Sequence, residues 1–209
     1  KKLEKKLKKI KPNIIIHLAA RSTVNREIKK KNYLFNNVKA TQNLIDLMQK
    51  LKITKIIFSS TAAVYNKTSK FINEKDKLNP ISNYGRSKLL AEKIIQNHKN
   101  IKYVILRFFN VSGCIANPLI GEFHNPETHL IPISVYKAIK GNPINIFGKK
   151  YSTKDGTCIR DYVHIKDICS AIKRSINYMK KNNSIILNIG SGHGTSNKEV
   201  ITKLRKVLK

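Results

Sequence analysis

The chain has 209 residues and a mass of 23.9 kDa, enough for one large domain with a hydrophobic core of its own. Hydrophobic residues make up 41% of the sequence and charged residues 26%, which excludes a collagen-like, low-complexity or wholly disordered chain. The unusual feature is the net charge of +30, from 42 basic and 12 acidic residues. Such an excess first suggests a protein that binds nucleic acid or an anionic membrane surface.

The basic residues themselves argue against that function. They comprise 35 lysines and only 7 arginines, whereas phosphate and base recognition favours the planar fork of arginine. Isoleucine (31) and asparagine (22) are also abundant, and both share A/T-rich codons with lysine. We therefore attribute the charge mainly to nucleotide bias at tolerant surface positions and expect no specific nucleic-acid partner. A polyanion-binding protein is the alternative.

The three cysteines, Cys114, Cys158 and Cys169, form no CxxC pair and are odd in number. A disulfide framework or a zinc site is therefore not expected, and no metal-binding residue is predicted. Unpaired cysteines favour a reducing compartment, so we expect a cytoplasmic location. The longest apolar runs, such as 14–16, are far shorter than the roughly 20 residues of a membrane-spanning helix, so no membrane partner is expected.

Hydrophobic periodicity predicts strands and helices in alternation along the chain. A short amphipathic helix is expected before Pro12. Strands are predicted at 13–18, 55–59, 101–106, 144–147 and 185–189. Helices are predicted at roughly 32–51, 83–98, 131–140, 166–180 and 196–208. This βαβα order indicates an α/β fold with a parallel, doubly wound sheet that helices cover on both faces.

In a doubly wound sheet the ligand crevice lies beyond the carboxyl ends of the strands. Three predicted strands end in segments of interest: HLAA at 17–20, the hydroxyl-rich FSSTAAVY at 58–65, and RFFN at 107–110. Two further stretches, 110–128 and 148–158, lack periodicity, and loops of that length in a compact domain are usually functional. We therefore look for chemistry in these segments.

Tyr84 and Lys88 form the sharpest pair of candidate catalytic residues. At i and i+4 on a predicted helix they share one face, so the lysine ammonium can lie near the phenol. A free phenol has a pKa of about 10, and a neighbouring cation lowers this pKa toward that of a useful general base. A hydroxyl from Thr61 would complete a proton-transfer site for an alcohol. The Tyr-x-x-x-Lys spacing alone is weak evidence for a catalytic site, because a solvated helix face explains it more often.

The wider context of this pair resembles the extended short-chain dehydrogenase/reductases, and within them the sugar-nucleotide 4-epimerases. The segments that carry the resemblance, in collinear order, are NNV (36–38), FSSTAAVYN (58–66), SNYGRSK (82–88), LRFFNVSG (106–113), THLIP (128–132), NIFGKKYSTKDGTCIRDYVHI (145–165) and LNIGSGHGTS (187–196). Together they cover nearly the whole chain. The resemblance implies a partial Rossmann-like, NAD-binding sheet in residues 1–110. Residues 111–209 would form a smaller, mostly substrate-binding α/β region, with some segments returning to that sheet.

The resemblance also implies a role for individual residues. Tyr84 would be the catalytic acid/base, Lys88 its electrostatic partner and a ligand of the NAD ribose, and Thr61 the third catalytic residue. Asn37 would support the site. The implied NAD-binding positions are Leu18, Ala19, Ala20, Asn37, Ser59, Tyr84, Lys88 and Phe109. The implied UDP-sugar positions are Thr61, Asn110, His129, Leu130, Asn145, Phe147, Arg160 and Tyr162. The guanidinium fork of Arg160 suits a diphosphate.

Some of these residues have plainer interpretations that the sequence leaves open. Arg160 could simply form an ion pair with Asp155 or Asp161. His129 could cap a helix or belong to the core, as isolated histidines generally do. His17 is expected to pack rather than to bind a ligand.

The implied reaction is NAD-dependent epimerisation at C4 of a UDP-hexose, which interconverts UDP-glucose and UDP-galactose through a 4-keto intermediate. Similar sugar-nucleotide dehydratases carry an acidic residue directly after the catalytic threonine, where this chain has Ala62 and Ala63. Proton transfer at the 4-hydroxyl is the chemistry that remains, and it favours epimerisation. The alternatives are a dehydratase, another sugar-nucleotide epimerase of the family, and a non-catalytic partner of an intact subunit.

Members of the family begin with a GxxGxxG turn that binds the NAD pyrophosphate, and no such turn precedes the first predicted strand here. The segment that follows position 209 in the family carries a further substrate-binding arginine. We therefore expect an internal fragment of a longer enzyme, or a decayed copy, that is inactive and does not retain NAD by itself. An intact form would be a homodimer, joined through the helices near 32–51 and 83–98.

Overall fold

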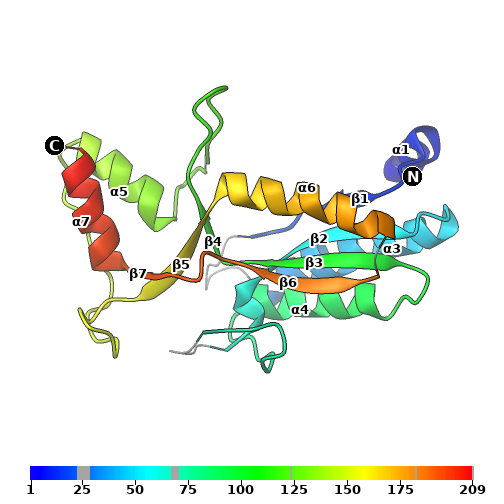
Figure 1. Ribbon diagram of the computed structural model, residues 1–209, viewed down its shortest axis with the longest axis horizontal. Coiled ribbons are helices and arrows are strands. Elements are labelled where there is room, and N and C mark those ends of the chain that lie inside the picture. Colours follow the sequence, from blue (N-terminus) through cyan, green and yellow to red (C-terminus); the bar gives the residue numbers. More distant parts are fainter. Residues whose placement is uncertain (23–28, 67–70, 123, 182, 209) are drawn as a thin grey trace. The chain divides into compact units, whose positions relative to one another are not determined.

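The computed structural model in Figure 1 describes residues 1–22, 29–66, 71–122, 124–181 and 183–208. The chain forms two compact units. The first comprises residues 1–108 and 170–189, and the second comprises residues 109–169 and 190–209. Each unit has a sheet of its own. Within the described residues, no helix is both long and apolar enough to cross a membrane.

The first unit contains a parallel sheet of four strands. These are β1 (Ile15–His17), β2 (Lys55–Thr61), β3 (Lys102–Phe108) and β6 (Ile185–Ile189), in the spatial order β1-β2-β3-β6. All three strand pairs are parallel, and the register aligns Thr61 with Phe108 at the carboxyl ends of β2 and β3. The predicted parallel α/β fold is confirmed, and it resembles the Rossmann fold.

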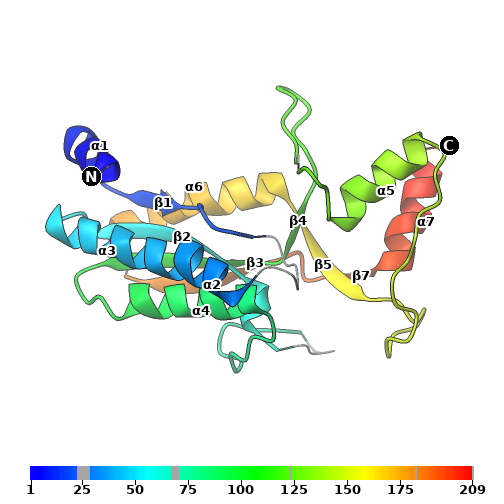
Figure 2. The same cartoon turned by 180° about the vertical axis from the view of Figure 1, so that it is seen from behind.

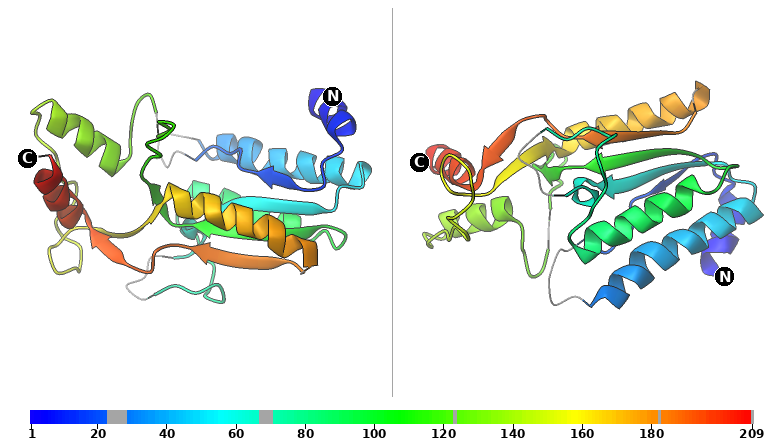
Figure 3. Two further views of the ribbon diagram at one scale, coloured as in Figure 1. Left: turned by 45° about the horizontal axis from the view of Figure 1, so that its top comes forward. Right: turned by 90° about the horizontal axis from the view of Figure 1, so that it is seen from below.

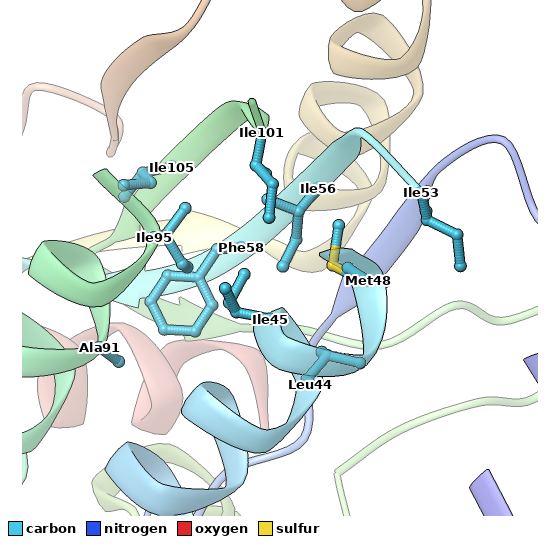
Figure 4. Packing of buried hydrophobic residues seen from close by; sticks show 10 residues of the cluster. All are labelled: Leu44, Ile45, Met48, Ile53, Ile56, Phe58, Ala91, Ile95, Ile101 and Ile105. Carbon is cyan, nitrogen blue, oxygen red and sulfur yellow. The ribbon is translucent and has the colours of Figure 1, made fainter. Parts of the chain in front are cut away.

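Side chains alternate along the central strands and supply two separate cores. One core lies between the sheet and the helices α3 (Ala40–Lys50) and α4 (Asn83–Gln96), as Figure 4 shows. Its buried residues are Leu44, Ile45, Met48, Ile53, Ile56, Phe58, Ala91, Ile95, Ile101 and Ile105. The opposite core packs Ile57, Val104 and Leu106 against Met179 of α6 (Ile165–Lys181). Helices therefore cover both faces, as Figure 3 shows, and the predicted double winding is confirmed.

The helix predicted at 32–51 consists of three parts. It begins as α2 (Lys30–Tyr33), continues as a π-helical turn, η1 (Leu34–Lys39), and ends as α3. Figure 2 shows α2 and α3 lying along the same face as α4. π-helical turns often occur at functional sites, and this one holds Asn37, whose side chain is buried. Ahead of β1, α1 (Lys2–Ile10) ends before Pro12, as predicted.

The second unit contains a sheet of three short strands and two helices. The strands are β4 (Asn110–Ser112), β5 (Ile159–His164) and β7 (Gly194–Ser196), and the helices are α5 (Leu130–Ile139) and α7 (Asn197–Val207). β5 is central, parallel to β4 and antiparallel to β7. A capping box of Ser196 and Glu199 begins α7. The predicted helices at 83–98, 131–140, 166–180 and 196–208 are thus confirmed to within a few residues.

The strand predicted at 144–147 is wrong. These residues have no regular secondary structure, and no described strand pairs with them. Ile144 and Ile146 are half-buried while Asn145 and Phe147 are exposed, so the alternating pattern reflects packing without a ladder of hydrogen bonds. Conversely, the three strands of the second unit were not predicted, because each is short and pairs with a partner distant in sequence.

A buried ion pair joins α4 to β3 in the first unit. Arg107 and Glu92 are 2% and 0% exposed, and their side chains form two hydrogen bonds of 2.7 and 3.1 Å. The hydroxyl of Ser60 donates to the same carboxylate at 2.5 Å, and Arg107 also donates to the hydroxyl of Tyr65 at 2.7 Å. The charges therefore have the additional partners that a buried ion pair requires.

Removing one partner of this pair should destabilise the first unit strongly. Arg107→Met leaves the Glu92 carboxylate buried without a counter-charge and should lower the free energy of unfolding by roughly 3–5 kcal/mol. The double variant Arg107→Met/Glu92→Leu removes both charges and should recover much of that loss. Glu4→Gln, which breaks an exposed ion pair with Lys8 and Lys50, is the control and should change little. Urea unfolding measures all three; a double variant no more stable than Arg107→Met alone would contradict this account.

Candidate active site

Thr61 and Tyr84 come together where β2 ends and α4 begins. Thr61 is the last residue of β2 and caps the short 3₁₀ turn η2 (Ala62–Val64), its hydroxyl accepting a hydrogen bond of 3.1 Å from the amide of Ala63. Tyr84 lies in the first turn of α4, where the hydroxyl of the N-cap Ser82 accepts from the amide of Gly85 at 3.0 Å. The side chain of Thr61 lies close enough to Tyr84 to lower the pKa of its phenol in part.

The close approach of α4 to η2 depends on the absence of a side chain at position 85. A β-carbon added to Gly85 would lie 2.2 Å from the carbonyl oxygen of Ala63 and 2.9 Å from its carbonyl carbon. Because both atoms belong to the backbone, they cannot rotate away. Glycine is therefore needed for α4 to start directly against η2.

Lys88 lies one turn after Tyr84 and is 3% exposed. Its ammonium donates to the carbonyl oxygen of Ser59 at 2.6 Å and lies 4.6 Å from the centre of the Phe58 ring. Burial lowers the pKa of Lys88 to about 8, and the charge of Glu92 opposes this effect. The side chain is still mostly protonated at pH 7.

The expected lowering of the Tyr84 pKa by Lys88 is not what the structure gives. Burial is the largest influence and raises the pKa of Tyr84, while the nearby Thr61 side chain lowers it in part and nearby Tyr33 raises it. Desolvation disfavours the phenolate more than any neighbouring group stabilises it. The ammonium of Lys88 is meanwhile bonded to the Ser59 carbonyl, not to the phenol.

Asn37 links three segments around Tyr84. Its amide exchanges hydrogen bonds of 2.8 and 3.1 Å with the backbone of Arg21, which follows β1, and donates to the hydroxyl of Ser87 at 2.9 Å. Ser87 in turn donates to the carbonyl of Tyr84 at 2.7 Å. The backbone carbonyl of Asn37 accepts from the hydroxyl of Thr41. Each partner orients the next, so Asn37 fixes the first turn of α4.

The end of β1 lies beside this cluster in the sheet. His17 is buried against Phe58, and its ring contacts the hydroxyl of Thr41 at 3.1 Å, consistent with the packing role expected for it. Burial lowers the pKa of His17 to about 4, with a smaller contribution from the charge of Lys88. The hydroxyl of Ser59 donates to the His17 carbonyl at 3.3 Å. The predicted NAD-binding residues that follow, Leu18, Ala19 and Ala20, are exposed or half-buried.

The remaining predicted site residues belong to the second unit. Arg160 and Tyr162 lie two apart on β5 and so share one face of the strand. Burial raises the pKa of Tyr162, and the charge of Arg160 lowers it in part. Tyr162 also lines a cavity of about 330 Å³ between α5 and α7.

Neither aspartate considered as a partner of Arg160 is available to it. Asp161 accepts hydrogen bonds from the amides of Ser191 and Gly192 and from the Ser191 hydroxyl, at 2.7–2.9 Å. Asp155 accepts from Ser196 and Thr157, and these bonds lower its pKa. Among the described residues, no ion pair involves Arg160. Its exposed guanidinium is thus available for a ligand.

The other predicted UDP-sugar residues are dispersed over the second unit. Asn110 begins β4, His129 caps α5 and Leu130 is its first residue. Asn145 and Phe147 lie in the irregular segment before β5 and are exposed. The predicted NAD residue Phe109 directly precedes β4 and is half-buried.

The residues that support the candidate catalytic side chains were not predicted from the sequence. Glu92 follows Lys88 by four positions, so the same spacing rule that singled out Tyr84 and Lys88 could have extended the face by one turn. Its partner Arg107 lies in the RFFN segment that was noted only as the end of a strand. Asp161 was considered only as a partner for a neighbouring charge, whereas it holds the turn at 190–192.

Fold and site together define a Rossmann-like α/β protein with a Thr, Tyr-x-x-x-Lys site at the carboxyl edge of a parallel sheet. A sequence model of the NAD dependent epimerase/dehydratase family matches residues 1–190, and the chain belongs to this family.

Named relatives fall within one group of enzymes. The chain is 41% identical to a UDP-glucose 4-epimerase of Lactobacillus helveticus, over 98% of this chain and 64% of that protein. It is 36% identical to the one from Rhizobium meliloti, over 100% of this chain and 66% of that protein. The chain thus spans slightly less than two thirds of the length of these relatives.

Solved structures agree with the sequence relatives. The UDP-glucose 4-epimerase from Brucella ovis in complex with NAD superposes with a TM-score of 0.90 at 36% identity, covering 96% of this chain and 64% of that chain. The UDP-glucose 4-epimerase from Bifidobacterium longum in complex with NAD+ and UDP gives a TM-score of 0.91 at 31% identity, with 99% and 64% covered. The fold of the chain is therefore similar to that of these enzymes.

Substituting Gly85 should separate α4 from η2. In Gly85→Ala the new methyl group meets the backbone of Ala63, so the helix must shift and the free energy of unfolding should fall by about 1–3 kcal/mol. Gly121→Ala is a suitable control, because its β-carbon would make an ordinary contact of 3.5 Å with Cys114. Urea denaturation of both variants is the measurement. Equal midpoints for the two would show that α4 does not need the close approach.

Proposed function

We propose that the chain acts in the NAD-dependent interconversion of UDP-glucose and UDP-galactose by epimerisation at C4. The observation that carries the proposal is the arrangement of Thr61, Tyr84 and Lys88 at the carboxyl end of β2, without a carboxylate next to Thr61. The named relatives support it. Such an enzyme would work in galactose metabolism, and a cytoplasmic location would suit its three free cysteines.

The residues at the carboxyl ends of β1 and β2 fit the nicotinamide half of NAD. Leu18 is 54% exposed, and Ala19 and Ala20 are small enough to let a flat ring approach the backbone. The ammonium of Lys88 has three N–H donors, and the hydrogen bond to Ser59 occupies one of them, which suits it to ribose hydroxyls. The chemistry that NAD supplies when bound is reversible hydride transfer at C4 of the sugar.

In this reaction the chain's own residues would carry out the proton transfer. Tyr84 would act as the phenolate, taking the proton of the C4 hydroxyl to become a phenol and returning that proton to the 4-oxygen of the inverted product. Thr61, whose side chain lies near Tyr84, would hold the C4 oxygen in line with that phenol. Because burial raises the pKa of Tyr84, proton transfer needs a positive charge nearby. Lys88, one helical turn away, is the cation positioned to oppose the effect of burial.

The second unit would bind the UDP-sugar. Arg160 is exposed and without an ion pair among the described residues, as a ligand of a diphosphate should be. Tyr162 on the same face of β5 would contact the nucleotide. The predicted UDP-sugar residues Asn110, His129, Leu130, Asn145 and Phe147 would complete this site. Anchoring the diphosphate would keep the 4-keto intermediate from escaping while its sugar turns over.

A carboxylate that could eliminate water is not found beside the catalytic threonine. Ala62 and Ala63 form η2 directly after Thr61. Glu92, the acidic residue on the same helix as Lys88, is held by Ser60 and Arg107. Epimerisation is therefore favoured over 4,6-dehydration.

We also propose a homodimer formed through the helices at 32–51 and 83–98, which are α2, η1, α3 and α4. Leu34 and Leu90 are exposed apolar residues on these helices. Together with Pro80 and Leu89 they line a groove of about 260 Å³. Apolar surface of this kind on adjacent helices suits packing against a second copy.

Substitutions at the catalytic positions test the proposal on the product of the whole gene. Tyr84→Phe should lower kcat by roughly 10²–10⁴-fold, because it removes the proton acceptor while the ring still packs. Lys88→Met should lower both kcat and the affinity for NAD, and Thr61→Val should have a smaller effect on kcat. Tyr103→Phe is the matched control, since Tyr103 pairs with Ile56 at the opposite end of the sheet. Near-normal turnover by Tyr84→Phe would exclude the proposed acid/base.

The fate of isotope and mass distinguishes epimerisation from dehydration. With UDP-galactose deuterated at C4, the whole gene product should yield UDP-glucose of unchanged mass, because the hydride leaves and returns to the same carbon. Mass spectrometry of the product shows both whether the deuterium is retained and whether water has been lost. Loss of one water, giving a 6-deoxy-4-keto sugar, would instead assign the protein to the dehydratases of the family.

A further inference from the structure

Four potential metal ligands converge in the second unit, in the loop between β4 and α5. They are Glu122, His124, Glu127 and His129, and one ligand atom from each lies within 4.8 Å of all the others. The spacing E-x-H-x-x-E-x-H places them within eight residues. Two of the chain's 12 acidic residues are thus concentrated at one point of a strongly basic protein.

The ligand atoms lie about as close together as the ligands of one small ion, and without an ion they contact one another as ion pairs and a hydrogen bond. His124 Nδ1 lies 3.0 Å from Glu122 Oε1 and 3.7 Å from Glu127 Oε2, and His129 Nδ1 lies 3.8 Å from Glu127 Oε1. His129 Nδ1 also contacts Glu122 Oε1. With metal–ligand bonds of about 2.0–2.2 Å, the ligands of a tetrahedral zinc ion lie roughly 3.3–3.6 Å apart. Small side-chain adjustments would therefore close the site around an ion.

The surrounding contacts orient the ligands. The carboxylate of Glu127 accepts hydrogen bonds from the amides of Thr128 and His129, at 2.7 and 2.9 Å, which fixes its direction. The rings of His124 and His129 are nearly perpendicular, at 88°, with centres 5.3 Å apart, so both Nδ1 atoms can face one point without a clash between the rings. Such outer contacts are characteristic of metal sites, where they hold the ligands in place.

We propose that Glu122, His124, Glu127 and His129 bind one zinc ion. Two imidazole nitrogens and two carboxylate oxygens form a donor set that zinc accepts, and the two carboxylates balance its charge. No metal site was predicted from the sequence, because the cysteines form no pair at metal-ligand spacing. Here the ligands are histidines and glutamates.

The proposed site would organise the start of α5. Glu122 and His124 come from the loop, whereas His129 is the N-cap of the helix. An ion shared between them would close the loop onto the helix and restrict the chain just before Leu130. The role is structural, because four protein ligands fill the coordination sphere. His129 takes part through Nδ1, which leaves its Nε2 for the UDP-sugar site proposed above.

Zinc binding can be measured on the 209-residue chain, produced without a histidine tag and stripped with a chelator. Titration in competition with a fluorescent zinc indicator should show one zinc ion per chain. His124→Ala and Glu127→Gln should each weaken binding by at least about tenfold, because each removes a ligand. The ligands lie in an exposed loop, and unchanged far-ultraviolet circular dichroism would show that the variants keep the fold.

Two control variants test whether zinc binds instead to a histidine or a cysteine outside the cluster. His193→Ala removes an exposed histidine outside the cluster, and Cys114→Ser removes the thiol of the same loop. Both should bind zinc as tightly as the unmodified chain. X-ray absorption at the zinc edge should show nitrogen and oxygen ligands and no sulfur. No stoichiometric uptake, or uptake unaffected by His124→Ala and Glu127→Gln, would overturn the proposal and leave a cluster of ion pairs only.

Discussion

The first turn of α4 packs directly against the turn that follows β2, and the geometry of the candidate active site depends on that contact. Gly85 permits it, because any β-carbon there would collide with the backbone of Ala63. Ser82 caps the helix at this point and Asn37 ties it to the end of β1 through Ser87. The proximity of Thr61 and Tyr84 follows from this backbone arrangement.

Burial at this edge of the sheet imposes a second constraint, because charged groups inside it must be balanced. Lys88 and Glu92 lie on successive turns of α4, and Arg107 on β3 neutralises Glu92. The ammonium of Lys88 is therefore buried near an ion pair whose two charges neutralise each other. Burying this ammonium costs solvation free energy, and that cost lowers the pKa of Lys88. The same desolvation raises the pKa of Tyr84, so the site as built favours the protonated phenol.

Elements with strong periodicity were predictable from the sequence, and the weakly periodic ones were not. The long strands β2 and β3 are apolar on both faces, which only a sheet covered by helices on both sides explains. The strand expected at 144–147 has alternating apolar residues, but no described strand pairs with it, because pairing is decided by segments distant in sequence. β4, β5 and β7 are three to six residues long and hold together through one another. The π-helical turn that places Asn37 leaves no signature in a helical hydrophobic pattern.

The sequence by itself determined the fold class, the family resemblance and the residue types at the candidate site, because periodicity and collinear motifs are local properties of the chain. It also indicated epimerisation over dehydration, through Ala62 and Ala63. Only the tertiary structure decided which hydrogen bonds those residues form and how deeply they are buried. It showed that Lys88 bonds a backbone carbonyl, that Asp161 holds a turn and leaves Arg160 unpaired among the described residues, and that two histidines and two glutamates converge ahead of α5. Desolvation and hydrogen-bond partners depend on segments far apart in sequence, so no local pattern specifies them.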